Sequence, residues 1–174
     1  YTIMGRYGDN NNTLYLGSFP SNEFIRDCNI KYIINCTGRK NNYIDPKKYK
    51  CNELLFDVAK WKYSNETELN KFKKLDHLID TIHANINNGN TVIHCLAGAH
   101  RAPFITGSYI LKYGHKSNTK LIKDYGDTLN NSQDIYKFMK NLRKWVDPIA
   151  TYDTVLSQYK QYLTKASKNV SNKM

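Results

Sequence analysis

The sequence is poor in cysteine, proline and long apolar runs. Among 174 residues there are four cysteines and four prolines. The cysteines follow no framework spacing and form no Cys-x-x-Cys pair, which argues against a disulfide scaffold and a zinc site and favours a reducing compartment. No run approaches about 18 consecutive apolar residues, so we expect no transmembrane helix. We expect no metal and no cofactor, and a cytoplasmic or nuclear location.

Acidic residues are also scarce. The chain has 15 Asp and Glu against 26 Lys and Arg, which gives a formal net charge of +11. The lysines are dispersed rather than gathered in one block. Such a surface attracts phosphorylated substrates, and it also binds nucleic acid non-specifically at low salt. The charge alone therefore does not distinguish an enzyme for phosphorylated substrates from a nucleic-acid-binding protein. Length and a hydrophobic fraction of 40% indicate one globular domain.

The run from Val92 to Arg101 carries the most chemical information. A β-branched pair leads into Cys95, a glycine follows at position 98, and Arg101 begins a helical pattern. We expect a loop whose inward amides and helix N-terminus hold a phosphate and favour the thiolate of Cys95, the nucleophile. Arg101 can bind two phosphoryl oxygens at once. The alternative is a buried structural cysteine with an arginine that only caps nearby.

The other members of this loop have expected roles too. Gly98 allows a positive φ or a close backbone approach. His94 is expected to orient the loop by hydrogen bonds rather than to act as a base. His100 either shapes the pocket wall or lies solvated at the rim. The expected phosphate-binding residues are Leu96, Ala97, Gly98, Ala99, His100 and Arg101.

At these residues the chain resembles the cysteine-dependent protein tyrosine phosphatases, whose loop reads His-Cys, five residues, Arg. Its short length and the order of its segments resemble the dual-specificity branch. Residues 14–18 and 30–36, with a helix between them, are similar to that family's opening strands. The resemblance runs from about residue 13 to residue 145. We expect a catalytic domain over residues 13–150, and a C-terminal helix and tail over residues 151–174 that pack on it or extend from it.

Periodicity predicts an α/β fold with a mostly parallel central sheet flanked by helices, and the resemblance implies that this is a single phosphatase-like domain. The remaining C-terminal helix either packs on the domain or meets a partner. The predicted strands are 13–17, 31–36, 51–58 and 91–94, the predicted loop is 38–50, and the predicted helices are 22–28, 66–87, 102–113, 119–129, 132–145 and 153–168.

The resemblance implies a general acid, an aspartate after the strand that precedes the long helix. Asp57 occupies that place, 38 residues before Cys95. It would protonate the leaving oxygen and then act as base for the hydrolytic water. The gap is a few residues longer than the family suggests, so the loop over residues 59–65 is expected to be extended. The alternative is a plain strand-end aspartate.

Position 102 departs from the family pattern. Most members carry serine or threonine after the arginine, and its hydroxyl assists breakdown of the phosphocysteine. Here Arg101-Ala102-Pro103 resembles the phosphatases of regenerating liver. We therefore expect a slow enzyme that accumulates its covalent intermediate.

The resemblance implies two further residues. Cys36 ends the strand expected beside the central one, where related phosphatases carry a thiol that oxidises onto the nucleophile. A buried, small apolar role is the alternative for Cys36. Asn131 resembles an asparagine that some relatives use near the loop.

These features favour a phosphatase that hydrolyses phosphotyrosine in protein substrates and also accepts phosphoserine and phosphothreonine. Two alternative functions would use the same phosphate-binding loop. One is an enzyme acting on an RNA 5′ phosphate or a phosphoinositide, which the basic surface favours. The other is a phosphoprotein-binding module, since Ala102 could reduce turnover to near nothing. The sequence leaves the oligomeric state open.

Overall fold

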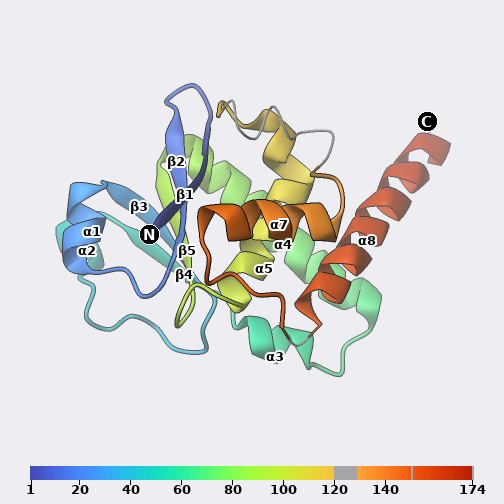
Figure 1. Cartoon of the computed structure of the whole chain (residues 1–174), viewed down its shortest axis with the longest axis horizontal. Helices are drawn as coiled ribbons and strands as arrows, with labels where there is room; N and C mark the ends of the chain where they lie inside the picture. Colours follow the sequence, from blue (N-terminus) through green and yellow to red (C-terminus); the bar gives the residue numbers. More distant parts are fainter. Residues whose placement is uncertain (120–128, 150, 174) are drawn as a thin grey trace.

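The computed structural model describes residues 1–119, 129–149 and 151–173, built around one five-stranded sheet (Figure 1). The strands lie in the order β1-β2-β5-β3-β4. Their bounds are Thr2–Tyr7 for β1, Asn12–Gly17 for β2, Ile30–Asn35 for β3, Asn52–Leu55 for β4 and Asn90–His94 for β5. Only β1 pairs antiparallel, with β2. The predicted α/β fold with a mostly parallel sheet is confirmed.

Helices cover both faces of the sheet (Figure 1). One face carries α1 (Asn22–Asp27) and α2 (Pro46–Tyr49), and the other carries α4 (Glu68–Asn88), α5 (Arg101–Tyr113), α7 (Ser132–Leu142) and α8 (Tyr152–Lys173). Two short elements, α3 (Val58–Lys62) and the 3₁₀ turn η1 (Gly114–Lys116), follow β4 and α5.

Alternation along the strands builds a core on each face. Ile33 belongs to the smaller cluster under α1 and α2, whereas Ile34 belongs to the larger cluster under α4 and α5. Both side chains are fully buried. A strand buried on both faces reads as a continuous β-branched run, and this is why β3 and β5 were predictable from the sequence.

The N-terminal strand β1 was not predicted. Its register against β2 shifts between Ile3 and Gly5, and Gly5 has a φ of 152°. A break of this kind interrupts the alternation of side chains on which a sequence-based strand prediction depends.

The segment after β3 differs most from the prediction. The predicted loop 38–50 contains α2, with Pro46 at its first turn and Asp45 as its N-cap. The predicted strand 51–58 is shorter, because β4 ends at Leu55 and Asp57 caps α3 instead of closing a strand. The extended loop expected over residues 59–65 begins with this short helix.

The long helix α4 follows its apolar stripe, with Phe72, Leu75 and Ile79 buried. Leu69, which also fits the stripe, is 56% exposed because it lies in the first turn, beyond the reach of the core. The N-cap of α4 is Thr67, whose Oγ1 accepts from Asn70 N at 3.3 Å.

The C-terminal helix α8 packs against α4, α5 and α7. Asp76 of α4 joins it to the body, accepting from Tyr159 Oη at 2.6 Å and from Lys112 Nζ of α5 at 2.8 Å. The predicted helix 119–129 falls mostly on residues 120–128, outside the described residues, and α7 ends three residues before its predicted end. In the described parts of the chain, no helix is both long and apolar enough to cross a bilayer.

Candidate active site

The parallel register brings the ends of β2, β3 and β5 to one edge of the sheet. Gly17 and Asn35 both pair with His94, the last residue of β5. The loop from Cys95 to His100 leaves β5 at this carboxyl edge and enters α5 at Arg101. The carboxyl edge of a parallel sheet is where α/β proteins bind their ligands.

The carbonyl groups of this loop are held from outside by one side chain that follows α7. Arg143 Nη2 donates to Ala97 O at 2.9 Å, and Arg143 Nε donates to Gly98 O at 3.1 Å. A third bond runs from Arg143 Nη1 to Thr2 Oγ1 of β1 at 3.3 Å. The guanidinium therefore fixes two successive peptide groups of the loop with one rigid fork.

Two further carbonyls of the loop are engaged by backbone amides. Asp147 N donates to Ala99 O at 2.9 Å, and Phe104 N donates to His100 O at 3.3 Å. Because the carbonyls bond away from the loop interior, the amides are left to face it. This is the polarity that an anion-binding loop requires.

Gly98 is the position at which only glycine fits. Its φ is +64°, in the left-handed region. A Cβ there would lie 2.7 Å from the carbonyl carbon and oxygen of Gly17, and 2.9 Å from Arg143 Nη2. Both the turn and the close approach to β2 therefore depend on a glycine.

The N-terminus of α5 adds a second source of donors. Its N-cap, His100, makes no side-chain capping hydrogen bond, so the first amides of this thirteen-residue helix have no partner from a cap. Cys95 lies beneath them with 2% of its surface exposed, and Arg101, in the first turn, is half-buried. Leu96 at the lip is 66% exposed. The arrangement suits an anion above a buried thiol.

His94 is buried and hydrogen-bonded through both ring nitrogens. Asn41 Nδ2 lies 2.9 Å from Nε2, and Cys95 O lies 3.4 Å from Nδ1. A carbonyl only accepts, so Nδ1 carries the proton and Nε2 accepts from the amide of Asn41. Burial and, less strongly, the positive charge of Arg101 together lower the pKa of His94 to about 4, against the opposing effect of the hydrogen bond to Cys95 O. The ring is therefore neutral at physiological pH and holds the loop's first peptide.

Asp57 stands at the same edge, after β4. Two strand spacings, or about 10 Å, separate β4 from β5. Asp57 Oδ1 accepts from Lys60 N at 3.0 Å, as the N-cap of α3. Oδ2 faces Gly38, where a Cβ would lie 2.7 Å from it. One carboxylate oxygen thus holds the side chain at the start of α3, and the other points toward Gly38.

Cys36 follows β3 directly beside Cys95. Its backbone amide donates to His94 O at 2.8 Å, and its side chain is fully buried. Burial, and then the neighbouring charge of Cys95, raise the pKa of the Cys36 thiol well above its ordinary value. Cys36 is therefore a protonated thiol in the ground state.

Asn131 is not brought to the loop. It is the N-cap of α7, where Oδ1 accepts from Asp134 N at 2.9 Å and Nδ2 donates to Asp134 Oδ2 at 2.7 Å. Arg143 lies at the other end of the same helix, about 18 Å away at 1.5 Å per residue. The amide of Asn131 therefore caps a helix, far from the loop.

Two residues at the site were missed by the sequence analysis. Arg143 has no motif around it, and it acts only because α7 returns its C-terminal end to the loop. Tyr152, at the start of α8, is 5% exposed, and its ring is tilted against that of Phe104 with 5.4 Å between the ring centroids. Burial raises the pKa of Tyr152 to about 12, while the charge of Arg101 opposes that rise. Tyr152 therefore forms part of the wall beside Arg101.

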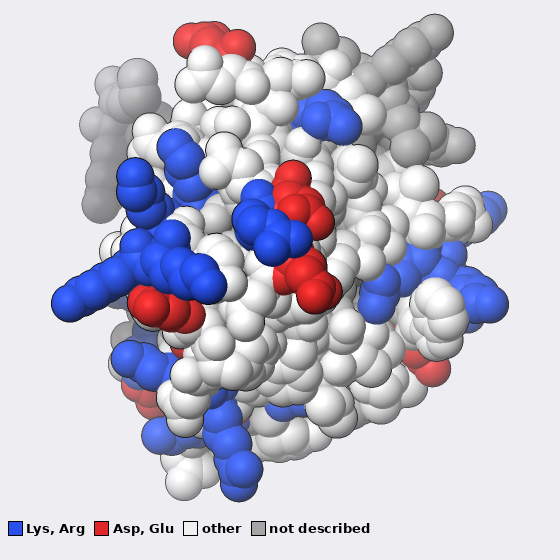
Figure 2. Space-filling view, turned by 90° about the vertical axis from the view of Figure 1, so that its left-hand side faces the viewer, with Lys and Arg blue, Asp and Glu red and all other residues white. Residues whose placement is uncertain are grey.

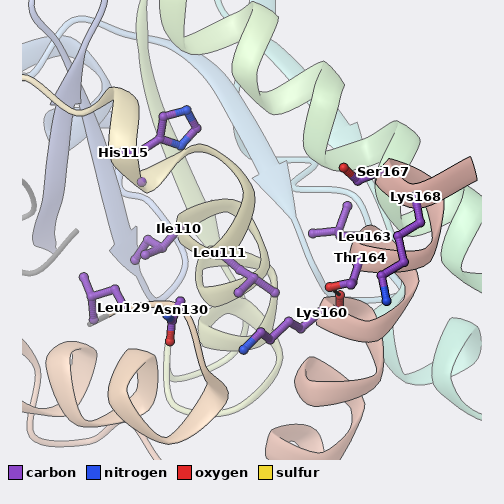
Figure 3. A pocket seen from close by; sticks show the side chains of 11 residues that line it. Ile110, Leu111, His115, Leu129, Asn130, Lys160, Leu163, Thr164, Ser167 and Lys168 are labelled. Atoms are coloured by element: carbon purple, nitrogen blue, oxygen red, sulfur yellow. Dashed lines mark hydrogen bonds between the residues drawn. The ribbon is translucent and has the colours of Figure 1, made fainter. Parts of the chain in front are cut away.

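A separate hollow of about 510 Å³ lies between α5, η1 and α8 (Figure 3). Ile110, Leu111 and Leu163 form its apolar part, and Lys160 and Lys168 extend over it from α8. None of its lining residues belongs to the loop 94–101, so this hollow is distinct from the candidate active site.

Comparison with known proteins agrees with this geometry. The sequence model of the family described as "Dual specificity phosphatase, catalytic domain" matches residues 14–162, which include the first half of α8. No curated protein sequence matches the chain.

Solved structures share the fold at low sequence identity. Human DUSP28 has a TM-score of 0.64 at 16% identity, covering 88% of this chain and 94% of that one. DUSP15 has a TM-score of 0.59 at 20% identity, covering 84% and 82%. PTPMT1 in complex with PI(5)P has a TM-score of 0.56 at 13% identity, covering 88% and 94%.

Proposed function

The chain belongs to the dual-specificity phosphatase family, and from this membership we propose that it hydrolyses phosphotyrosine, phosphoserine and phosphothreonine in proteins through a phosphocysteine on Cys95. The observation that carries the proposal is the orientation of the loop. Arg143 and the amide of Asp147 engage the carbonyls of residues 97–99, so the amides of the loop face the space above Cys95.

The reaction proceeds in two steps. In the first, the thiolate of Cys95 attacks phosphorus, the bond to the substrate oxygen breaks, and Asp57 gives that oxygen a proton. The inward amides and Arg101 bind the equatorial oxygens as their charge redistributes. In the second, water attacks the phosphocysteine, Asp57 takes the proton from the water, and the thiolate and inorganic phosphate are released.

Acceptance of serine and threonine as well as tyrosine follows from the shape of the mouth. Leu96 is 66% exposed at the lip of the loop, and Ala97 is also exposed. A phosphate on a short side chain can reach a loop whose lip stands at the surface, whereas a deep cleft admits only the longer phosphotyrosine.

The test is phosphate release from matched phosphotyrosine and phosphothreonine peptides, with Cys95→Ser as the control. We expect release from both peptides and none above background from the variant. Activity that survives Cys95→Ser would rule out the proposed mechanism. Cys28→Ser, at a partly buried cysteine outside the loop, serves as the matched thiol control.

A slow-turnover phosphoprotein-binding role is the second candidate, and the observation that favours it is Ala102. This side chain is fully buried and follows Arg101 without offering a hydroxyl. A pure binding module would never form a covalent adduct, so mass spectrometry of the quenched protein separates the two roles. An added phosphate mapped to Cys95 supports the enzyme.

The basic surface leaves RNA 5′ phosphates and phosphoinositides as alternative substrates. On the face shown in Figure 2, Lys and Arg lie in separate groups with uncharged surface between them, rather than in one stripe. A continuous basic stripe is the footprint expected of a nucleic-acid track. The test compares the rates of phosphate release from triphosphate-ended RNA, PI(5)P vesicles and phosphopeptides. These rates rank the three substrate classes directly.

The proposed domain division places the catalytic unit at residues 13–150 and the C-terminal helix and tail at 151–174. Because α8 packs on α4, α5 and α7, we propose that the C-terminal helix packs on the catalytic unit rather than extending from it. A cytoplasmic or nuclear location stays part of the proposal, and imaging of the tagged chain tests it.

A further inference from the structure

The strand β4 forms the open edge of the sheet on the side away from β1. It has a single neighbouring strand, β3. Phe56 N donates to Asn35 O at 2.8 Å, so the peptide groups of Leu54 and Phe56 face β3. Because peptide groups alternate along a strand, those of Glu53 and Leu55 face outward. The edge therefore offers donors and acceptors to an additional strand.

Apart from its short length of four residues, this edge lacks the usual protection against pairing. The opposite edge, β1, is interrupted by the register shift at Gly5 and carries Arg6. β4 reads Asn-Glu-Leu-Leu, with neither lysine nor proline, and its register against β3 is regular. Leu55 is 41% exposed on the α1–α2 side. An edge of this composition is suited to accept a partner strand.

The one charge within β4 is already engaged. Asn41 N donates to the carboxylate of Glu53 at 3.2 Å, and Asn35 Nδ2 donates to it at 3.3 Å. Glu53 is therefore held against the loop after β3 and does not project over the edge.

A hollow of about 510 Å³ runs between β4 and α4, next to this edge. Its floor is apolar and its rim is basic. The apolar residues are Leu54, Phe56 and Leu78, and the others are Lys73, Lys74, His77 and Thr81. The residues from α4 recur at one-turn intervals, so they form one continuous face of the helix beside the strand.

The rim carries an excess of positive charge. Lys73 is exposed and has no carboxylate partner within the described ranges. Lys74 pairs with Glu66, an acid that does not line the hollow. Asp80, further along α4, is neutralised from the other side by Lys112 at 2.7 Å. An acidic segment laid along β4 would therefore meet an unopposed cation.

We propose that the β4 edge and its hollow form a docking site for an extended acidic segment of a partner protein, which adds to the sheet as a sixth strand. Backbone hydrogen bonds to Glu53 and Leu55 supply affinity, and alternate apolar side chains of the partner fill the hollow over Leu54 and Phe56. Acidic side chains further along the same face of the segment meet Lys73 and Lys74 at the rim of the hollow. A second copy of this chain suits the site less, because each copy carries a net charge of +11.

The first experiment measures binding of labelled peptides to the full chain by fluorescence anisotropy. One peptide carries valine at two alternate positions and glutamate at the next two, with threonine between them, so that the valines and glutamates share one face. A second peptide has lysine in place of glutamate, and a third is the acidic peptide with a central proline. We expect the acidic peptide alone to bind, since lysine is repelled and proline removes a backbone donor. Absence of binding at about 1 mM acidic peptide, or equal binding of the proline peptide, would overturn the proposal.

Two variants and one structural measurement locate the site. Lys73→Glu/Lys74→Glu should weaken acidic-peptide binding at least about tenfold, while the matched pair Lys165→Glu/Lys168→Glu on α8 should leave it unchanged. Hydrogen exchange at the amides of Glu53 and Leu55 should slow when peptide binds. Unchanged exchange there, or sedimentation showing that the protein alone dimerises through β4, would overturn the proposal. Catalytic activity is not the readout, so failure here is separable from failure of the proposed function.

Discussion

Arg143 Nε donates to the carbonyl oxygen of Gly98 at 3.1 Å, and the same guanidinium reaches Ala97 O. Through these bonds a residue beyond α7 determines which way two peptide groups of the candidate phosphate loop point. Burial lowers the pKa of Arg143 below its usual value, and the charge of Cys95 opposes that shift. Arg143 is therefore a positioning residue, since it acts through the loop rather than on the phosphate.

Replacing Arg143 with lysine should lower kcat/KM by about 10- to 100-fold, because an ammonium cannot bond both carbonyls in a fixed plane. Binding of tungstate, a phosphate analogue, should weaken together with kcat/KM. A loss of stability far from the loop would not weaken tungstate binding. Lys144→Ala, at the exposed neighbour, is the matched control and should retain full activity. Equal kinetics for Arg143→Lys and the wild type would contradict this assignment.

Replacing Ala102 with serine should speed the second half-reaction. The added hydroxyl would stand behind the loop at a fully buried position, where it can donate to the departing sulfur. We expect a several-fold higher kcat and a smaller pre-steady-state burst, measured by quench flow. If the burst keeps its amplitude, breakdown of the phosphocysteine is not the slow step.

Replacing Gly38 with alanine should displace the carboxylate of Asp57, because the new Cβ would lie 2.7 Å from Oδ2. The expected loss is smaller than the roughly 10²- to 10⁴-fold loss for Asp57→Asn, and both should depend on the leaving group. Phosphothreonine, a poor leaving group, should suffer most, and 2,4-dinitrophenyl phosphate should be almost unaffected. Equal losses of activity on both substrates would show that Asp57 is not the general acid.

His94 should make stability depend on pH on the acidic side of neutrality. Its pKa is lowered from 6.5 to about 4 in the folded protein, chiefly by burial. As the pH falls from about 6.5 towards 4, the unfolded chain takes up this proton and the folded chain does not, so the free energy of unfolding falls. The contribution is on the order of 3 kcal/mol. Urea unfolding at pH 7 and pH 4.5 should show a steeper loss for the wild type than for His94→Gln.

Cys36 should protect the nucleophile from irreversible oxidation. Peroxide converts the thiolate of Cys95 to a sulfenic acid, and attack by the Cys36 sulfur forms the disulfide and releases water. Because burial raises the pKa of the Cys36 thiol, the second step should be slow. Wild-type activity should return with dithiothreitol after mild peroxide treatment, and activity of Cys36→Ser should not. Equal recovery of both proteins would leave Cys36 with a packing role only.

The sequence predicted the centre of the fold because local signals agree there. Val92 and Ile93 are β-branched and buried on both faces, Gly98 has a required φ, and α5 begins where the loop ends. Each of these features needs only near neighbours in the chain, so periodicity and residue type determine them.

Tertiary contacts decide the parts that the sequence analysis missed. β1 has an irregular register, and Asp57 caps α3 because the chain turns at Leu55 rather than continuing the strand. Arg143 becomes part of the site only when α7 packs back over the sheet. No spacing between Arg143 and Cys95 in the sequence indicates that contact.

The bond from Arg143 to Thr2 has a consequence for how the protein can be divided. β1 is remote in sequence from the loop, yet it shares with the loop the residue that holds the carbonyls of Ala97 and Gly98. A fragment that begins at residue 13 would still contain every residue proposed for chemistry, but it would expose β2 as a new sheet edge and leave one donor of the guanidinium without its acceptor. A fragment that contains all the residues proposed for chemistry is therefore not long enough to hold them in place. It must also include β1.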